Sequence, residues 1–142
     1  METSNKYALI TGASIGIGYE LAKLFAADGY NLILVARDAQ ELDKTAAELQ
    51  QHNIEISIIT KDLFDPANAF SLYEDVQRLG IKIDVLVNNA GQGVYGQFKD
   101  TELQRELDII HLNISSLVVL TKLFVKDMVD LNSGKILYLA SI

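Results

Sequence analysis

Short runs of apolar residues alternate along this chain with longer segments in which apolar residues recur every three or four positions. The short runs are rich in Val, Ile and Leu and predict five strands, over residues 7–10, 31–35, 54–59, 84–87 and 135–139. Several runs lack polar alternation, as expected for strands covered by helices on both faces. The pattern therefore predicts an α/β fold with a parallel sheet.

The segments between these runs predict the connecting helices. A stripe of apolar residues from Ile17 to Leu24 forms the first, and Gly29 follows where a left-handed cap would end it. The second is predicted over residues 39–51, and Pro66 stands where a proline opens a helix without breaking it. Each helix would cross from one parallel strand to the next.

Residues 101–104 resemble a helix start, and the longest helix is predicted over residues 107–128, either unbroken or interrupted near Asn113. Its most apolar part, residues 116–125, contains Lys122 and is shorter than the ~18 residues needed to span a bilayer. The first ten residues hold too few apolar side chains for a signal peptide. We therefore expect no membrane span and a cytoplasmic location.

Composition narrows the class of protein further. The 142 residues, 49% apolar and 22% charged, suit one folded domain over residues 1–142 and no disordered or fibrous chain. The net charge of −7 disfavours nucleic acid and anionic membranes as partners. The chain has no cysteine, and its two histidines, His52 and His111, lie far apart, so we expect no metal site.

A glycine-rich turn, Thr11-Gly12-Ala13-Ser14-Ile15-Gly16-Ile17-Gly18, joins the first strand to the first helix. Gly12 suits the tight turn, Gly16 lets a phosphate approach the main chain, and Gly18 lets helix and strand pack closely. The free N–H groups of the helix terminus would hold that phosphate. The structural alternative is an ordinary turn, but the strand and helix on either side favour a dinucleotide site formed by Gly12, Ser14, Ile15, Gly16, Ile17 and Gly18.

The end of the second strand distinguishes between dinucleotides. NAD-binding folds usually place a carboxylate there for the ribose 2′-hydroxyl, whereas NADP-binding folds place an arginine for the 2′-phosphate. Here Ala36 and Arg37 occupy these positions, which favours NADP over NAD. The alternative is that Arg37 only pairs with Asp38 or faces solvent.

With these residues the chain resembles the short-chain dehydrogenase/reductase family in its simple form. The resemblance rests on the glycine turn, Asp62-Leu63 after the third strand, Asn88-Asn89-Ala90-Gly91 after the fourth, Asn113, and Ser141 after the fifth. It implies a Rossmann-like, doubly wound, three-layered fold with strand order 3-2-1-4-5. It also adds Asp62 and Leu63 beside the adenine, and Asn89, Ala90 and Gly91 beside the ribose and nicotinamide. Asp62 could instead cap a turn, and the Asn-Asn-Ala-Gly segment is also ordinary turn chemistry.

The resemblance further implies a catalytic set. Asn113 would support a proton relay and Ser141 would polarise the carbonyl, whereas the family also uses a tyrosine with a lysine four residues later. From their spacing to the lysines, we expect none of the six tyrosines to substitute for that tyrosine. We expect the carboxyl-terminal strands of the fold to be missing, and the chain alone to be inactive.

Two surfaces are predicted to mediate homo-oligomer formation. The strand at 135–139 would lie at an open sheet edge, and the helix over residues 113–130 is more apolar than one sheet face can cover. The helix commonly forms a dimer interface in the family that this chain resembles.

The leading hypothesis is an NADP(H)-dependent oxidoreductase that transfers a hydride to or from a small-molecule carbonyl or secondary alcohol, with this chain supplying the coenzyme-binding half. A catalytically silent nucleotide-binding or regulatory module is the alternative. A Rossmann-like methyltransferase is a third reading, against which Asn88-Asn89-Ala90-Gly91 argues.

Overall fold

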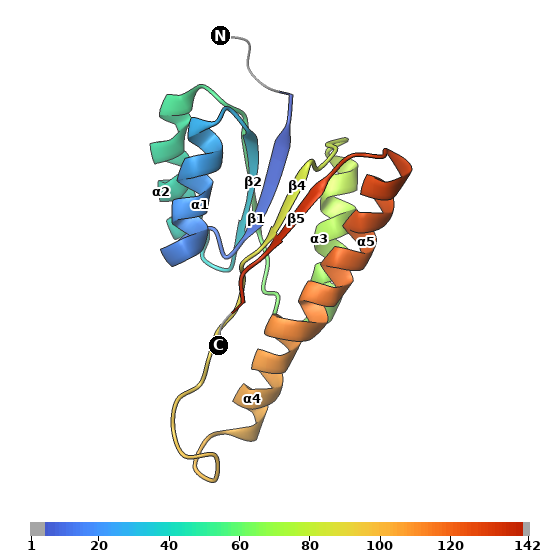
Figure 1. Cartoon of the computed structure of the whole chain (residues 1–142). Helices are drawn as coiled ribbons and strands as arrows, with labels where there is room; N and C mark the ends of the chain where they lie inside the picture. Colours follow the sequence, from blue (N-terminus) through green and yellow to red (C-terminus); the bar gives the residue numbers. More distant parts are fainter. Residues whose placement is uncertain (1–4, 141–142) are drawn as a thin grey trace.

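The computed structural model describes residues 5–140. Its parallel sheet has the order β3-β2-β1-β4-β5, as the sequence predicts. Helices α1 and α2 cover one face, while α3 and α5 cover the other, so the fold has three layers (Figure 1). The strands are β1 (Tyr7–Thr11), β2 (Asn31–Ala36), β3 (Ile56–Thr60), β4 (Val85–Asn88) and β5 (Lys135–Tyr138).

Two of the helices, α2 and α3, begin at an aspartate that caps them. Asp38 accepts N–H bonds from Gln40 and Glu41 before α2, Asp65 accepts one from Ala67 before α3, and Gly29 ends α1 with φ of 83°. The helical elements are α1 (Gly16–Ala27), α2 (Ala39–Leu49), the 3₁₀ turn η1 (Gln50–His52), α3 (Pro66–Arg78), α4 (Leu103–Ile110), the π-helical turn η2 (His111–Ser115) and α5 (Ser116–Asp130).

Two apolar cores lie on opposite faces of the sheet. Leu9 and Leu86 point toward α3 and α5 and pack with Phe124, whereas Ile10 and Val87 point toward α1 and α2. Successive strand residues alternate between the two faces, so the continuous apolar runs fill both cores. This packing fixes the carboxyl ends of β1 and β4 side by side.

The long helix runs from Leu103 to Asp130, with η2 centred on Asn113. The interruption expected near Asn113 is therefore a π turn inside a continuous helix, a distortion that often marks functional positions. Over the described residues this helix is long and apolar enough to cross a membrane by length and composition. The expectation that no segment reaches that length is wrong, although the buried side of the helix, including Leu120 and Phe124, packs in the core.

Among residues 5–140, strand β5 lies at the edge of the sheet and pairs with β4 alone. Leu137 and Tyr138 on this strand are 39% and 45% exposed. The predicted open edge is confirmed.

Candidate functional site

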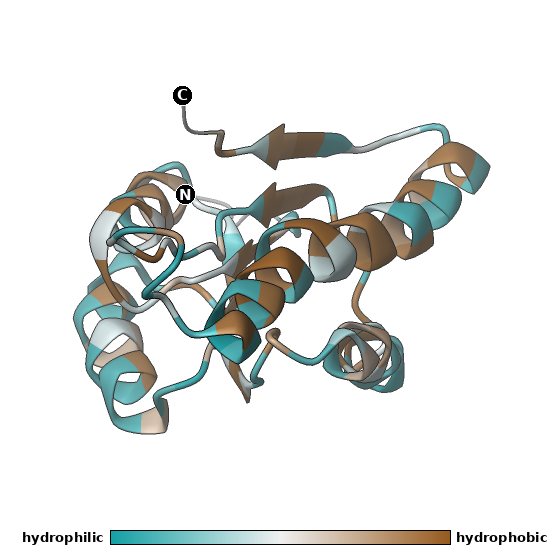
Figure 2. Cartoon of the chain, turned by 90° about the horizontal axis from the view of Figure 1, so that it is seen from below, coloured by the Kyte–Doolittle hydropathy of each residue, from teal (hydrophilic) through white to brown (hydrophobic). Residues whose placement is uncertain are grey.

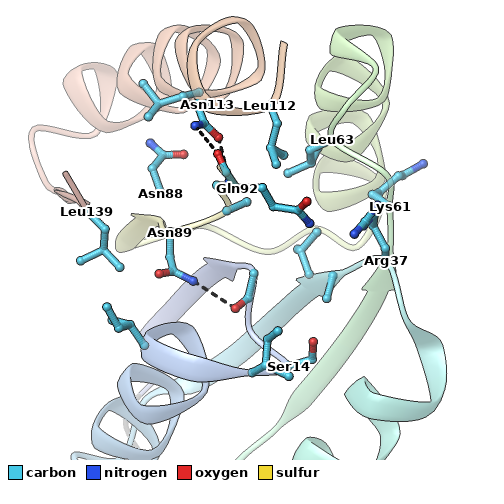
Figure 3. Close-up of a pocket in the computed structure, with 18 of the residues that line it drawn as sticks. Ser14, Arg37, Lys61, Leu63, Asn88, Asn89, Gln92, Leu112, Asn113 and Leu139 are labelled. Carbon is cyan, nitrogen blue, oxygen red and sulfur yellow. Dashed lines mark hydrogen bonds between the residues drawn. The ribbon is translucent and has the colours of Figure 1, made fainter. Parts of the chain in front are cut away.

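A cavity of about 1340 Å³ opens at the carboxyl ends of the central strands (Figure 3). Here the chain turns from β1 toward β2 on one side and from β4 toward β5 on the other. Ligands of open α/β sheets bind where the strand order reverses in this way. The lining combines the glycine turn, the start of α2, the segment after β4, and the π turn.

The glycine turn forms one wall of the cavity. Gly12 and Gly16 have φ of 63° and 59°, which L-residues rarely adopt, and the exposed Gly16 has open space around it. A β-carbon at Gly18 would overlap the carbonyl oxygen of Gly12 and the side-chain nitrogen of Asn89. No side chain caps the N-terminus of α1 at Ile15, so its first N–H groups can bind an anion.

Thr11 and Asn89 hold the turn against β4. The Thr11 hydroxyl oxygen accepts bonds from the main-chain N–H groups of Asn89 (3.0 Å) and Ala90 (2.9 Å). The Asn89 side chain donates to the carbonyl oxygens of Thr11 (3.1 Å) and Gly12 (3.0 Å). Asn89 lines the cavity, but its side-chain nitrogen is used to brace the turn (Figure 3). No local pattern in the sequence indicates this role of Thr11.

Charged side chains surround the end of the cavity near β2. The Arg37 guanidinium lies over the Phe64 ring, 4.7 Å from its centroid, and forms no ion pair with any described residue. Asp38 is engaged as the cap of α2, so the alternative pairing with Arg37 does not occur. The Ser14 hydroxyl donates to Glu41 at 3.3 Å, which adds a carboxylate to this end of the site.

The residues after β3 divide between the cavity and the turn beside it. Leu63 is buried and lines the cavity. Asp62 is exposed and does not line it, because its carboxylate accepts a bond from the N–H of Phe64 at 2.9 Å. This is the turn-capping role weighed as the alternative for Asp62, and its contact with adenine stays a prediction.

Asn113 in the π turn faces the segment after β4 (Figure 3). Its side-chain nitrogen donates to the Gln92 carbonyl oxygen at 2.8 Å, and its side-chain oxygen accepts from the Gln92 N–H at 3.0 Å. A β-carbon at Gly91 would stand 3.2 Å from that oxygen, so a glycine leaves room for this pairing. Ser141, the other predicted catalytic residue, lies outside the described residues.

Most of the predicted site residues therefore converge on one cavity. Those that line it are Gly12, Ser14, Ile15, Ile17, Arg37, Leu63, Asn89, Ala90, Gly91 and Asn113, and those that do not are Gly16, Gly18 and Asp62. Further lining residues that the sequence did not single out include Glu41, Lys61, Gln92, Leu112 and Leu117. Lys61 follows β3 directly, so its position at a strand end could have indicated it. Within residues 5–140, no three His, Asp or Glu side chains form a group that could hold a metal ion.

The chain is similar to proteins of one known family. The family model described as short chain dehydrogenase matches residues 6–142. The chain belongs to the short-chain dehydrogenase family. Its five-stranded sheet and glycine turn are thus those of an oxidoreductase family.

Several relatives extend over almost the whole of this short-chain dehydrogenase. It is 38% identical over 140 residues to a very-long-chain 3-oxoacyl-CoA reductase of Phaeosphaeria nodorum, covering 95% of this chain and 41% of the reductase. A short-chain dehydrogenase of Sphingobium yanoikuyae in complex with NADPH has a TM-score of 0.90 and 33% identity, over 96% of this chain and 54% of that one. L-Sorbose reductase of Gluconobacter frateurii, complexed with NADPH and L-sorbose, has a TM-score of 0.90 and 30% identity, over 99% and 54%.

The chain thus spans about half or less of the length of these relatives.

Two of its tyrosines, Tyr19 and Tyr95, do stand four residues before a lysine, Lys23 and Lys99, so their exclusion by spacing is wrong. Position excludes them instead, because neither tyrosine lines the cavity. Tyr95 is fully exposed.

Tyr19 is also unsuited to proton transfer. Its hydroxyl donates to Glu48, and this hydrogen bond raises the pKa of Tyr19 above its usual value. The Lys23 ammonium lies 5.2 Å from the centre of the Tyr19 ring and also pairs with Glu20. A general acid near neutral pH needs the opposite shift in pKa.

Proposed function

We propose that the cavity of this short-chain dehydrogenase binds NADP(H), with the coenzyme pyrophosphate at residues 12–18. The observation that carries the proposal is the N-terminus of α1, which no side chain caps and which lies at the cavity. The glycine turn is packed so closely there that a side chain at Gly18 would not fit. Two of the solved relatives are complexes with NADPH, which supports the same class of ligand.

The preference for NADP over NAD rests on Arg37. Its guanidinium lines the cavity without an ion-pair partner among residues 5–140, and Ala36 beside it offers no carboxylate for a ribose 2′-hydroxyl. The negative charge of Glu41 disfavours a 2′-phosphate nearby and so acts against this preference. One oxygen of that carboxylate, however, accepts a hydrogen bond from the Ser14 hydroxyl. A free guanidinium can bind a 2′-phosphate through two hydrogen bonds.

In the whole protein we propose a hydride transfer between the coenzyme and a small-molecule carbonyl or secondary alcohol. NADPH supplies a hydride from nicotinamide C4 when bound. Asn113 would hold the segment at Gln92 beside the reacting groups, and Ser141 would polarise the carbonyl. Because no tyrosine of residues 5–140 lines the cavity, we expect this chain alone to bind coenzyme without reducing a ketone.

Titration of the chain with NADPH and with NADH tests the coenzyme assignment. NADPH should bind more tightly, and Arg37→Ala should weaken NADPH binding roughly tenfold while NADH binding changes less than about twofold. Lys126→Ala, which removes a positive charge from the exposed side of α5, is the matched control and should alter neither affinity.

Equal affinity of the parent chain for both coenzymes would contradict the NADP preference, and binding of neither would contradict the proposed function. Activity of the full-length protein separates the enzyme from a catalytically silent nucleotide-binding module. An oxidoreductase reduces a carbonyl with NADPH when its complete chain is present, whereas the silent module only binds it.

We also propose that two copies of the chain associate in the cytoplasm through the long helix. Its outward stripe consists of Leu103, Leu107, Ile110, Ile114 and Val118, each between 40% and 68% exposed. Figure 2 shows hydrophobic segments along the length of this helix. The surface is apolar enough to favour burial against a second copy.

A further inference from the structure

Two residues of the long helix, Asn113 and Arg105, bind the segment after β4 at Gln92. One of them, Arg105, has no place in the coenzyme site described above. The Gln92 main chain pairs with the Asn113 side chain in both directions, at 3.0 Å and 2.8 Å. In addition, the Gln92 side-chain oxygen accepts a hydrogen bond from the Arg105 guanidinium. Gln92 and Asn113 line the cavity, whereas Arg105 does not.

Arg105 comes from α4, eight residues before Asn113, which is about 12 Å along a helix axis. Its guanidinium lies over the Phe64 ring, 5.2 Å from the ring centroid. Phe64 packs against the core cluster beneath α3 and α5. The guanidinium therefore has two contacts, a ring anchored in the core and the Gln92 side chain, that together restrict its orientation.

The loop that follows Gln92 is exposed, and its internal hydrogen bonds lie at its far end, where the N–H groups of Asp100 and Thr101 donate to the Gln97 carbonyl oxygen. Residues 93–100 are all exposed and include Gly93 and Gly96. Their side chains add little to hold the loop in place, and glycine increases the entropy that must be lost when the loop is ordered. The contacts at Gln92 are therefore the main restraint on the start of this loop.

We propose that Arg105 is a positioning residue that fixes Gln92, and through it the loop and the Asn113 pairing, in the geometry that receives the nicotinamide half of the coenzyme. The proposal rests on the proposed function of the cavity. The Phe64 ring that orients Arg105 also contacts Arg37, whose guanidinium lies 4.7 Å from the ring centroid, so one aromatic side chain contacts both arginines. Ordering the loop before binding reduces the entropy lost when coenzyme binds.

Hydrogen exchange of the chain without coenzyme tests the positioning role directly. Arg105→Met keeps an unbranched apolar stem but loses the donors, and should speed exchange of the Gln92 N–H about fivefold or more. Gln92→Ala should speed exchange of the loop amides to the same extent, and the double variant should add nothing further. Gln92→Glu keeps an acceptor for Arg105 and should retain the protection seen in the parent. Unchanged protection in Arg105→Met would overturn the proposal whatever the chain binds.

Two ligands then distinguish positioning from long-range charge. Arg105→Met should weaken NADPH binding about fivefold, yet leave binding of adenosine 2′,5′-bisphosphate, which has no nicotinamide half, within about twofold of the parent. An equal loss for both ligands would show that the charge of Arg105 acts on the phosphate and would overturn the proposal. If the parent chain binds neither ligand, the proposed function fails, while the hydrogen-exchange result still decides the role of Arg105.

Discussion

At the scale of single residues, the glycine turn depends on one close approach. The backbone of Gly12 and the side chain of Asn89 occupy the space where a β-carbon at Gly18 would lie. Gly16, two residues earlier, has open space but a φ of 59°. The two glycines are therefore required for different physical reasons, steric contact at one and backbone conformation at the other.

Substitution by alanine separates these reasons. Gly18→Ala should lower the free energy of unfolding by roughly 3 kcal/mol, because the new β-carbon overlaps backbone that cannot move without shifting β1. Gly16→Ala should cost only about 1 kcal/mol, the conformational penalty of a positive φ. Urea unfolding of both variants without coenzyme measures the difference, and equal losses would show that the turn at Gly18 has room to adjust.

Residues that form part of a local motif were predictable from the sequence, and residues that act across elements were not. Part of the glycine turn, together with Arg37, Leu63 and Asn113, lines the cavity, while their contact with coenzyme stays a prediction. Arg105 and Phe64 are 41 positions apart in sequence, and no local pattern indicates that they meet. Asp62 had two readings, and only the structure shows its carboxylate on the N–H of Phe64.

At the scale of elements, α3 and α5 meet through a polar contact beside an aromatic one. The Tyr73 hydroxyl on α3 donates to the Asp127 carboxylate on α5 at 2.8 Å. The Tyr73 ring packs edge to face on Phe124, with centroids 5.1 Å apart. Burial, and then the bond to Asp127, raise the pKa of Tyr73 to about 12.

This shift predicts how stability depends on alkaline pH. The folded chain holds the Tyr73 proton more tightly than the unfolded chain, whose tyrosine has a pKa near 10. The stabilisation is therefore complete below pH 10 and is lost as the pH rises through about 12. Tyr73→Phe should be less stable by about 1 kcal/mol at pH 8, with the difference from the parent shrinking above pH 10.

Urea unfolding at pH 8 and at a pH above 11 measures this difference. Tyr95→Phe removes the hydroxyl of a fully exposed tyrosine and is the control, with no expected change at either pH. A gap between parent and Tyr73→Phe that stays constant with pH would contradict the assignment of the pKa shift to this contact.

The helices and strands themselves were largely predictable, because their periodicity and caps are local. Every predicted strand occurs, with Ile56–Thr60 beginning two residues later than expected. The interruption near Asn113 was foreseen, but its π geometry was not, because it depends on packing between the helix and the segment at Gln92. The start of this helical region at Leu103 agrees with the helix start expected at residues 101–104.

At the scale of the whole molecule, the outward stripe of the long helix is the surface through which we propose that two copies associate. Ile114→Glu places a charge in the middle of the stripe and should weaken self-association at least roughly 100-fold. Gln51→Glu adds the same charge on the exposed turn η1 and should leave the association unchanged. Sedimentation equilibrium measures both, and a monomeric parent chain at all concentrations would refute the dimer.

We propose that the glycine turn and the opposite wall of the cavity together hold a dinucleotide. Titration of the ¹⁵N-labelled chain with NADPH, followed by its amide resonances, tests this most directly. The largest changes should map to residues 12–18, to Arg37, and to residues 89–92. Changes that avoid residues 12–18, or no saturable change at millimolar NADPH, would contradict the claim.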